Sequence, residues 1–221
     1  MIPRIIHQTS GPHVPPGGQE CFDSVKRHHT DWDIRFYSDQ EMYSVLGLKK
    51  NERIGVEASD LFRLKILWEQ GGWYLDADMY AIGTLPTERD HYISYEEPGW
   101  MPRKVICNWA IGVEPKNPFI KACLDEGLRR LPDTGINVLY RTGPAMMSQL
   151  YERGDWGFTP HDWQLIGSRK FDRMDRSRFV PKEAKALHLF MGCWYRENWA
   201  GGFLPKVRMV EQYEKAFRTC S

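Results

Sequence analysis

The sequence predicts an α/β protein in which a mostly parallel sheet is flanked by helices within a single compact domain. Three observations predict this class. Short apolar or alternating runs, typical of strands, alternate with amphipathic helical segments along the whole chain. The 221 residues suffice for one domain with a sizeable core. No internal repeat, low-complexity tract or linker divides the sequence.

The first half begins with two predicted strands and a helix. Residues 4–7 (RIIH) form a short apolar run before a turn-forming loop, and residues 33–38 (DIRFYS) alternate as a strand does. Residues 59–70 have leucines at helical spacing. Ser59 is expected to cap this helix, and Gly71 to take the left-handed stop position. A strand is expected to follow directly and to run through the motif WYLDADM.

The second half continues the alternation of strands and helices. Asn117 and Pro118 signal a helix start, as a capping side chain and a first-turn proline. The expected elements are strands at 91–97 and 107–113, helices at 117–131 and 143–154, a strand at 186–194 and a C-terminal amphipathic helix at 204–217.

Composition narrows the class of partner and the compartment. Lys+Arg number 30 and Asp+Glu 29, for a formal charge of +1, which argues against a nucleic acid partner. Five scattered cysteines without a CxxC pair indicate reduced thiols in a reducing compartment. No signal peptide or membrane-spanning run is visible. We therefore expect a cytoplasmic protein, with peripheral membrane contact left open.

Two carboxylates interrupt an otherwise apolar run in WYLDADM. With the period of two of a strand, Asp76 and Asp78 lie on the same side as Tyr74. Their Cα atoms would be roughly 6–7 Å apart, and the ionised groups would repel by about 2–3 kcal/mol. A proton, a basic neighbour or a cation should compensate, and oxygen ligands suit Mg²⁺ or Mn²⁺. The alternative is that the strand has ended and both carboxylates are solvated turn residues.

A second pair of charges precedes this strand. Asp60 and Arg63 are three residues apart near the start of the predicted helix, so their side chains are neighbours. Residues 71–72 are both glycine, which permits a turn that folds back and brings the helix start to the strand end. The alternative is a surface ion pair worth a few tenths of a kcal/mol.

Several motifs together resemble the DxD glycosyltransferases of family 32 and the related toxin-type glucosyltransferases. In that family an S-D-x-x-R helix precedes G-G-x-Y-x-D-x-D. The resemblance runs in order over most of the chain. It rests on ASDLFRLKILWEQGGWYLDADM (58–79), the opening IPRIIHQTS (2–10), DWDIRFYSD (31–39), TGP (142–144) and HLFMGCW (188–194).

The resemblance implies a GT-A fold, with a Rossmann-like sheet, and sugar transfer from a nucleotide sugar with retention of configuration. It implies that Asp78 binds Mn²⁺ or Mg²⁺ directly and that Asp76 reaches the metal through water while holding the donor. Asp60 and Arg63 would contact the donor sugar and its diphosphate. With Asp76 they are the expected catalytic residues.

The remaining expected site residues bind metal or substrate. His188 is the further metal contact, with a hydrogen-bonded core histidine as the alternative. The expected substrate-binding residues are His7, Gln8, Tyr74, Asn108 and Trp194. For Tyr74 and Asn108 a purely structural place in the core or at a strand end is an open alternative.

The leading hypothesis is therefore a metal-dependent retaining glycosyltransferase that moves a hexosyl unit from a UDP- or GDP-linked sugar to a glycan or glycolipid acceptor, as in polysaccharide synthesis. Residues 1–115 would hold the nucleotide sugar and the metal, and 116–221 the acceptor side. Two alternatives remain. One is a Mg²⁺-dependent phosphatase with Asp76 as nucleophile, and the other is a non-enzymatic module that binds sugar nucleotides or glycans.

Overall fold

The computed structural model describes residues 1–9, 18–49, 55–96, 104–161 and 183–189. The chain divides into two compact units. The first comprises residues 1–12, 32–76 and 86–162, and the second residues 13–31, 77–85 and 163–221. The assignment of residues 1–115 and 116–221 to a donor half and an acceptor half stays a prediction.

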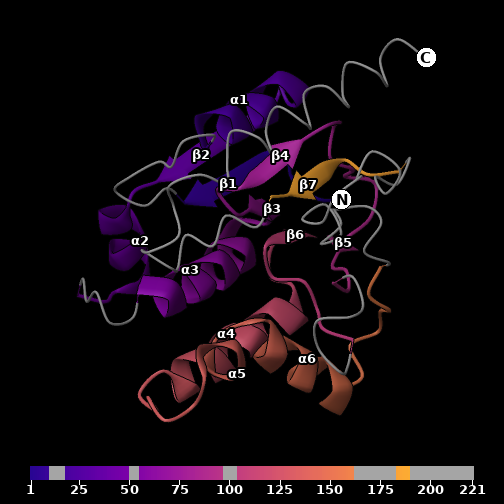
Figure 1. Ribbon diagram of the computed structural model, residues 1–221. Coiled ribbons are helices and arrows are strands. Elements are labelled where there is room, and N and C mark those ends of the chain that lie inside the picture. The colour runs from indigo at the N-terminus through magenta and orange to yellow at the C-terminus, as the bar shows by residue number, and fades with distance from the viewer. Residues whose placement is uncertain (10–17, 50–54, 97–103, 162–182, 190–221) are drawn as a thin grey trace, which may run out of the picture. The chain divides into compact units, whose positions relative to one another are not determined.

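The first unit is built on a mixed sheet with the strand order β2-β1-β3-β6-β5 (Figure 1). β1 pairs in parallel with β2 and β3, whereas β6 runs antiparallel to both of its neighbours, β3 and β5. Among the described strands of this sheet, β6 alone runs in the reverse direction. The strands are β1 (Ile5–Thr9), β2 (Asp33–Tyr37), β3 (Gly72–Leu75), β5 (His91–Tyr92) and β6 (Ala110–Val113). The predicted α/β class with a mostly parallel sheet is confirmed.

The reversal of β6 determines which residues meet at the edge of the sheet. In the β3–β6 pairing Leu75, the last residue of β3, lies opposite Ala110, the first residue of β6. The pairing continues one step further, since the backbone N–H of Asp76 donates to the carbonyl of Trp109 at 2.9 Å. Residues that follow β3 and residues that precede β6 therefore share one edge.

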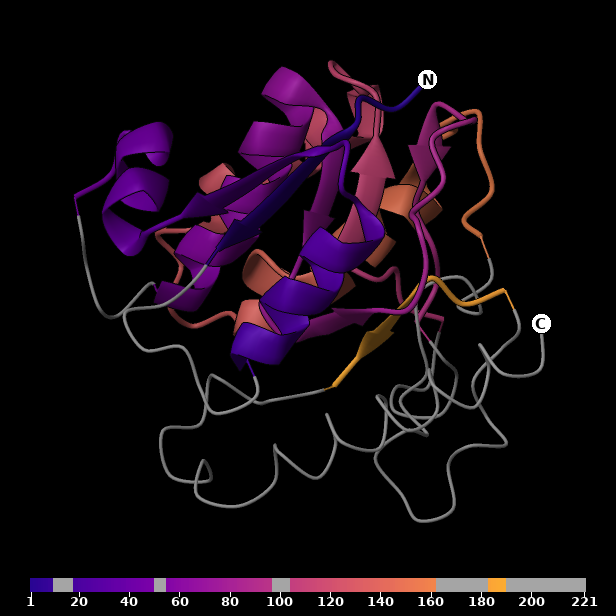
Figure 2. The ribbon, with the colours of Figure 1, turned by 90° about the horizontal axis from the view of Figure 1, so that it is seen from above.

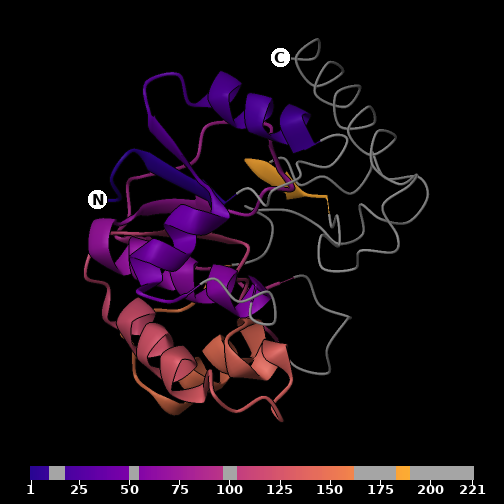
Figure 3. The same ribbon diagram turned by 90° about the vertical axis from the view of Figure 1, so that its left-hand side faces the viewer.

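The helix α3 (Gly55–Gln70) is the central helix of this unit. It contacts β1 and β3 of the sheet and also the helices α2, α4 and α5. Figures 1 and 3 show α4, α5 and α6 lying together on the side of α3 that faces away from the strands. The helices are α2 (Asp39–Leu46), α4 (Pro118–Arg130), α5 (Val138–Arg141) and α6 (Pro144–Arg153).

Apolar burial along α3 explains why the helix occupies this place. Leu61, Leu64 and Leu67 are fully buried in a core with Ile111 of β6 and Phe119 of α4. Burying a leucine side chain contributes about 1.5–3 kcal/mol. Because its buried side chains face both the sheet and α4, α3 holds the two layers together.

Two boundaries around α3 differ from expectation. The helix begins at Gly55, four residues before Ser59, so the prediction that Ser59 caps it is wrong. The Ser59 hydroxyl instead lies 3.4 Å from the Tyr74 hydroxyl. The following strand ends at Leu75, so the prediction that it carries both aspartates is wrong as well.

The turn from α3 into β3 requires glycine at both of its positions. Gly71 and Gly72 have φ values of 65° and 93°, a region that L side chains rarely adopt. A Cβ atom at Gly71 would lie 2.7 Å from the ring of Pro115, and one at Gly72 would lie 2.6 Å from the carbonyl oxygen of Ile5. The predicted left-handed glycine stop is confirmed, and the turn reverses the chain as expected.

The second unit contains α1 (Gly18–His28) and a two-stranded antiparallel sheet of β4 (Met79–Ala81) and β7 (Ala186–His188) (Figure 2). α1 packs against β4, and the buried Ser24 hydroxyl accepts a hydrogen bond from the backbone N–H of Ala81. The predicted late strand is described only as far as residue 189, and the predicted helix at 204–217 lies outside the described residues. No helix in the described ranges has the length and apolar character to cross a membrane.

Candidate functional site

The carboxylate of Asp60, on the first half of α3, is the centre of a buried polar network in the first unit. Its side chain is buried. Oδ1 accepts a hydrogen bond from the Asn108 amide at 2.9 Å, and Oδ2 accepts one from the Thr142 hydroxyl at 3.0 Å. Burial raises the pKa of Asp60 to about 6, against the opposing influence of Arg63 and Thr142. This carboxyl group titrates close to neutral pH while its orientation is fixed.

Arg63 lies one turn further along α3 and joins Asp60 to Asp76. Its Nη2 is 3.4 Å from Asp60 Oδ1 and 3.1 Å from Asp76 Oδ1. Its Nη1 donates to the backbone carbonyl of Asn108. Burial lowers the pKa of this guanidinium, but the electrostatic influence of its neighbours, above all the carboxylate of Asp76, outweighs burial and raises it overall. Arg63 is therefore a permanently charged, immobilised fork between two carboxylates.

Asp76 is the member of this group that solvent reaches. Its side chain is 19% exposed, whereas those of Asp60 and Arg63 are 3% and 2% exposed. Because it follows the last residue of β3 and its backbone is bonded to Trp109, it lies at the edge of the sheet where β6 begins. The alternative that Asp76 is merely a solvated turn residue is wrong, since its carboxylate forms an ion pair with Arg63.

Tyr74 is a structural neighbour of these groups. It is fully buried on β3, its hydroxyl lies 3.0 Å from the Thr9 hydroxyl, and the Arg63 guanidinium is 4.7 Å from its ring centre. Burial raises the pKa of Tyr74 to about 12, so the phenol stays neutral. A cation over an aromatic ring gains about 2 kcal/mol when desolvated, which helps to hold Arg63.

His7 and Gln8, at the carboxyl end of β1, differ in how their polar atoms are used. His7 is fully buried; its Nε2–H donates to the carbonyl of Gly71 at 2.9 Å, and its Nδ1 accepts from the Tyr37 hydroxyl at 3.0 Å. Burial lowers the pKa of His7 to about 4, so the ring is neutral. Gln8 is also fully buried, yet neither polar atom of its amide has a hydrogen-bond partner among the described residues. A contact of these two residues with a nucleotide stays a prediction.

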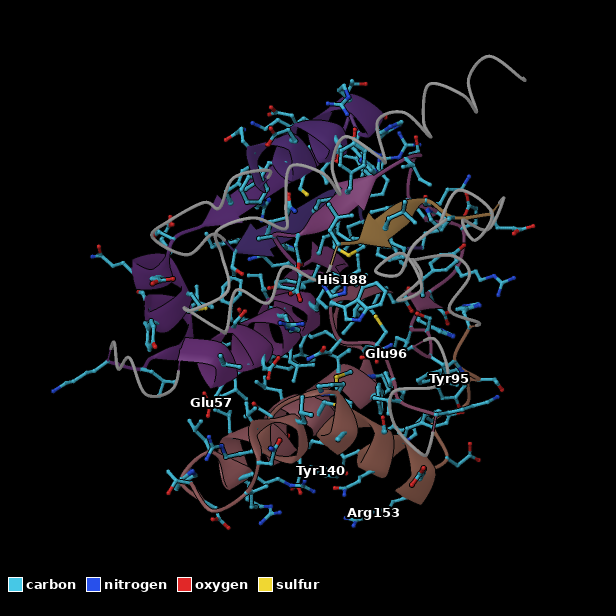
Figure 4. All side chains as sticks on the ribbon, in the orientation of Figure 1. Glu57, Tyr95, Glu96, Tyr140, Arg153 and His188 are labelled. Atoms are coloured by element: carbon cyan, nitrogen blue, oxygen red, sulfur yellow. The ribbon has the colours of Figure 1, made fainter. Side chains whose placement is uncertain are left out.

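In the second unit Asp78 and His188 form a buried pair. Each is 7% exposed, and His188 Nε2 is 3.0 Å from Asp78 Oδ1. The β4–β7 ladder sets this contact, since His188 lies opposite Met79 and the backbone N–H of Leu189 donates to the carbonyl of Asp78. Figure 4 labels His188 at the end of β7. A carboxylate oxygen and an imidazole nitrogen at this spacing are chemically suited to a divalent cation.

The structure therefore brings the expected residues into two groups. Asp60, Arg63, Asp76 and Asn108 contact one another in the first unit, and Asp78 contacts His188 in the second. Trp194 lies outside the described residues. Thr142 was not among the expected site residues, although it opens the TGP motif.

Comparison with known proteins identifies relatives of this chain. The family model described as a glycosyltransferase sugar-binding region containing a DXD motif matches residues 16–97. A relative from Schizosaccharomyces pombe, named inositol phosphoceramide mannosyltransferase 3, is 28% identical over 216 residues. The alignment covers 85% of this chain and 56% of the relative, so the chain spans just over half the length of that protein. These findings confirm the resemblance to the DxD glycosyltransferases.

Solved structures show the same fold at low sequence identity. A glycosyltransferase involved in glycosylation of the major capsid of PBCV-1 superposes with a TM-score of 0.55 and 12% identity, covering 94% of this chain and 98% of that one. The PaToxG glycosyltransferase gives 0.53 and 19%, with 69% of each chain covered. GlyE of Streptococcus pneumoniae gives 0.52 and 10%, covering 96% and 60%. The predicted GT-A fold is confirmed.

Proposed function

We propose that this chain, which resembles the DxD glycosyltransferases in motif order and fold, is a retaining glycosyltransferase that uses a nucleotide sugar and a divalent metal. One observation carries the proposal: the buried Asp60–Arg63–Asp76 network at the end of β3, inside the segment that matches the DXD sugar-binding family. A solvated turn would leave these groups independent. Here one guanidinium fixes two carboxylates and leaves only the second open to solvent.

The network suits the binding of a donor sugar. Asp76 is held by Arg63 and by its own backbone bond to Trp109, so its carboxylate can accept hydrogen bonds from donor hydroxyl groups without first being ordered. Such preorganisation lowers the cost of reaching the transition state. Arg63 contributes a fixed positive charge beside the position where the donor diphosphate becomes more negative.

The metal would be held by Asp78 and His188, whose oxygen and nitrogen are 3.0 Å apart, together with Asp76, two residues earlier in the chain. A bound Mn²⁺ or Mg²⁺ would stabilise the negative charge that grows on the leaving nucleoside diphosphate. The mixed oxygen and nitrogen donors favour Mn²⁺ over Mg²⁺.

The donor and acceptor are proposed from the relative's name. A mannosyltransferase that acts on inositol phosphoceramide makes a mannosyl nucleotide the first hexosyl donor to test, with UDP- and GDP-linked sugars as the wider panel. It also favours a glycolipid acceptor over a soluble glycan. A cytoplasmic protein in peripheral contact with a membrane would be consistent with such an acceptor.

The test is release of UDP or GDP from sugar nucleotides with Mn²⁺, by wild type and by Asp78→Ala. We expect turnover by the wild type and a loss of at least about 100-fold in the variant. Asp125→Ala is the matched control, because Asp125 is an exposed carboxylate on α4 paired with Lys121. Product NMR reports the anomeric configuration, and an inverted product would refute the retaining mechanism.

Two outcomes would favour the other functions. Tight donor binding without turnover, for any acceptor in the panel, would indicate a binding module. A beryllofluoride adduct on Asp76 would indicate a phosphatase. The ion pair of Asp76 with Arg63 argues against that second outcome, because the phosphoryl group of a substrate would have to approach the same carboxylate oxygens.

A further inference from the structure

A second buried ion pair lies next to the proposed donor site. Glu57, on α3, pairs with Arg141, the last residue of α5. They are 4% and 8% exposed, and Arg141 also donates to the backbone carbonyl of Asp133 at 3.0 Å. Figure 4 labels Glu57 on α3 and Tyr140, the residue before Arg141. This pair therefore ties α3 to the segment that ends α5.

Stability alone is a weak reason for such a pair. Removing two charges from water costs several kcal/mol per ion, and apolar residues of similar volume often stabilise a fold equally well. A buried pair does, however, fix two segments in one relative position.

The residue after Arg141 contacts the carboxylate of Asp60. Thr142 follows Arg141 directly, and its hydroxyl donates to Asp60 Oδ2 at 3.0 Å. Glu57 and Asp60 are three residues apart on the same helix. Two carboxylates on α3 therefore accept hydrogen bonds from two side chains that are adjacent in the sequence. α5 and α3 are thus joined at two points, and a shift of Arg141 must shift the Thr142 hydroxyl.

The Asp60 carboxylate is oriented by hydrogen bonds from two side chains, those of Asn108 and Thr142. The Asn108 amide occupies Oδ1, and Thr142 occupies Oδ2. Without the second hydrogen bond the carboxylate can rotate about its terminal torsion, which has a broad energy profile. Arg63 would then no longer be held by a fixed carboxylate at Asp60, and its position relative to Asp76 would change.

We propose that Glu57 and Arg141 are positioning residues that hold Thr142 on Asp60 and thereby fix Arg63 for transfer. This inference rests on the proposed function, since the effect is read out on donor turnover. Neither Glu57 nor Arg141 touches the donor. Both act through one hydroxyl group.

The first test replaces Thr142, because valine and serine are close to threonine in size. Thr142→Val removes the hydroxyl and keeps the shape, whereas Thr142→Ser keeps the hydroxyl. We expect Thr142→Val to lower kcat at least about tenfold with donor KM changed less than about threefold, since the loss is felt most where charge develops. Thr142→Ser should restore kcat to within about threefold of wild type.

Glu57→Gln tests the ion pair, and Glu69→Gln is its matched control. Glu69 pairs with Lys65 within α3, so the same chemical change is made on the same helix at a pair that does not involve α5. We expect Glu57→Gln to lower kcat about tenfold and Glu69→Gln to leave it unchanged. Thermal unfolding of both variants separates a general loss of stability from the effect on kcat.

The double variant Glu57→Gln/Thr142→Val decides whether the two act in series. If Glu57 acts through the hydroxyl, adding Glu57→Gln to Thr142→Val should lower kcat by less than about twofold more, so the effects are non-additive. Multiplying effects would overturn the proposal, as would full activity of Thr142→Val or failure of Thr142→Ser to restore kcat. If Glu57→Gln does not fold, the two Thr142 variants still decide. No turnover by the wild type would instead refute the proposed function.

Discussion

Replacing Asp60 by asparagine should remove a pH-dependent cost of folding. The pKa of Asp60 is raised from 3.8 to about 6, chiefly by burial. This difference of about 2 units corresponds to about 3 kcal/mol at 1.36 kcal/mol per unit. Between about pH 4 and pH 6 the folded protein keeps a proton that the unfolded chain has lost. The carboxyl's contribution to stability therefore falls as pH rises through this window and is constant above it.

The asparagine side chain has the same shape and no charge, so Asp60→Asn lacks this pH dependence. We expect the free energy of unfolding of the variant, minus that of the wild type, to rise by about 3 kcal/mol from pH 4 to pH 7. Urea unfolding followed by tryptophan fluorescence measures it at each pH, and taking the difference cancels the other titrating groups. Asp125→Asn, at an exposed position on α4, is the control for the change from carboxylate to amide outside the network.

The opposite slope would refute the reasoning. If the wild type gained stability relative to Asp60→Asn as pH rose, the carboxyl would be ionised well below pH 4 in the folded protein. Arg63 and Thr142 would then outweigh burial. A flat difference would mean that the Asp60 pKa is the same in the folded and unfolded states.

Three further outcomes are expected. Arg63→Lys keeps the charge but loses the fork, so donor turnover should fall at least about 100-fold while circular dichroism is unchanged; wild-type turnover would contradict this. Gly72→Ala places a Cβ 2.6 Å from the carbonyl oxygen of Ile5 at φ 93° and should cost about 2–3 kcal/mol in urea unfolding. Gly55→Ala, whose added Cβ would have no atom of the described residues within 4 Å, should not destabilise. His7, whose pKa is lowered to about 4 by burial, should show neutral-ring NMR shifts down to pH 5, and titration near pH 6.5 would refute its burial.

Local signals predicted much of the fold. The Asn117 side chain accepts from the N–H groups of Phe119 and Ile120, as the capping signal indicated, and β1 and β2 lie where the apolar and alternating runs placed them. The helix α2 was missed although Ser38 and Glu41 form a capping box, which the sequence displays. Ser59 is another cap-type residue, but it lies inside α3, because capping residues also occur within helices.

The site was predictable only where its parts are close in sequence. Asp60 and Arg63 are one helical turn apart, and the Gly71–Gly72 turn returns the chain to them, so their meeting with Asp76 could be foreseen. The contact of Asn108 with Asp60 depends on the direction of β6, which no local pattern encodes. Thr142 is 82 residues from Asp60, and its place depends on how α5 packs against α3.

The antiparallel course of β6 limits where the chain can change length. Because Asn108 lies two residues before Ala110, which is paired with Leu75, one added residue between them would carry the amide about 3.3 Å away from its partner carboxylate. Added residues upstream of Ile106, on the far side of Asn108, would leave that spacing intact. Loop grafting that is meant to keep the contact of Asn108 with Asp60 should therefore be confined to the upstream side of Ile106.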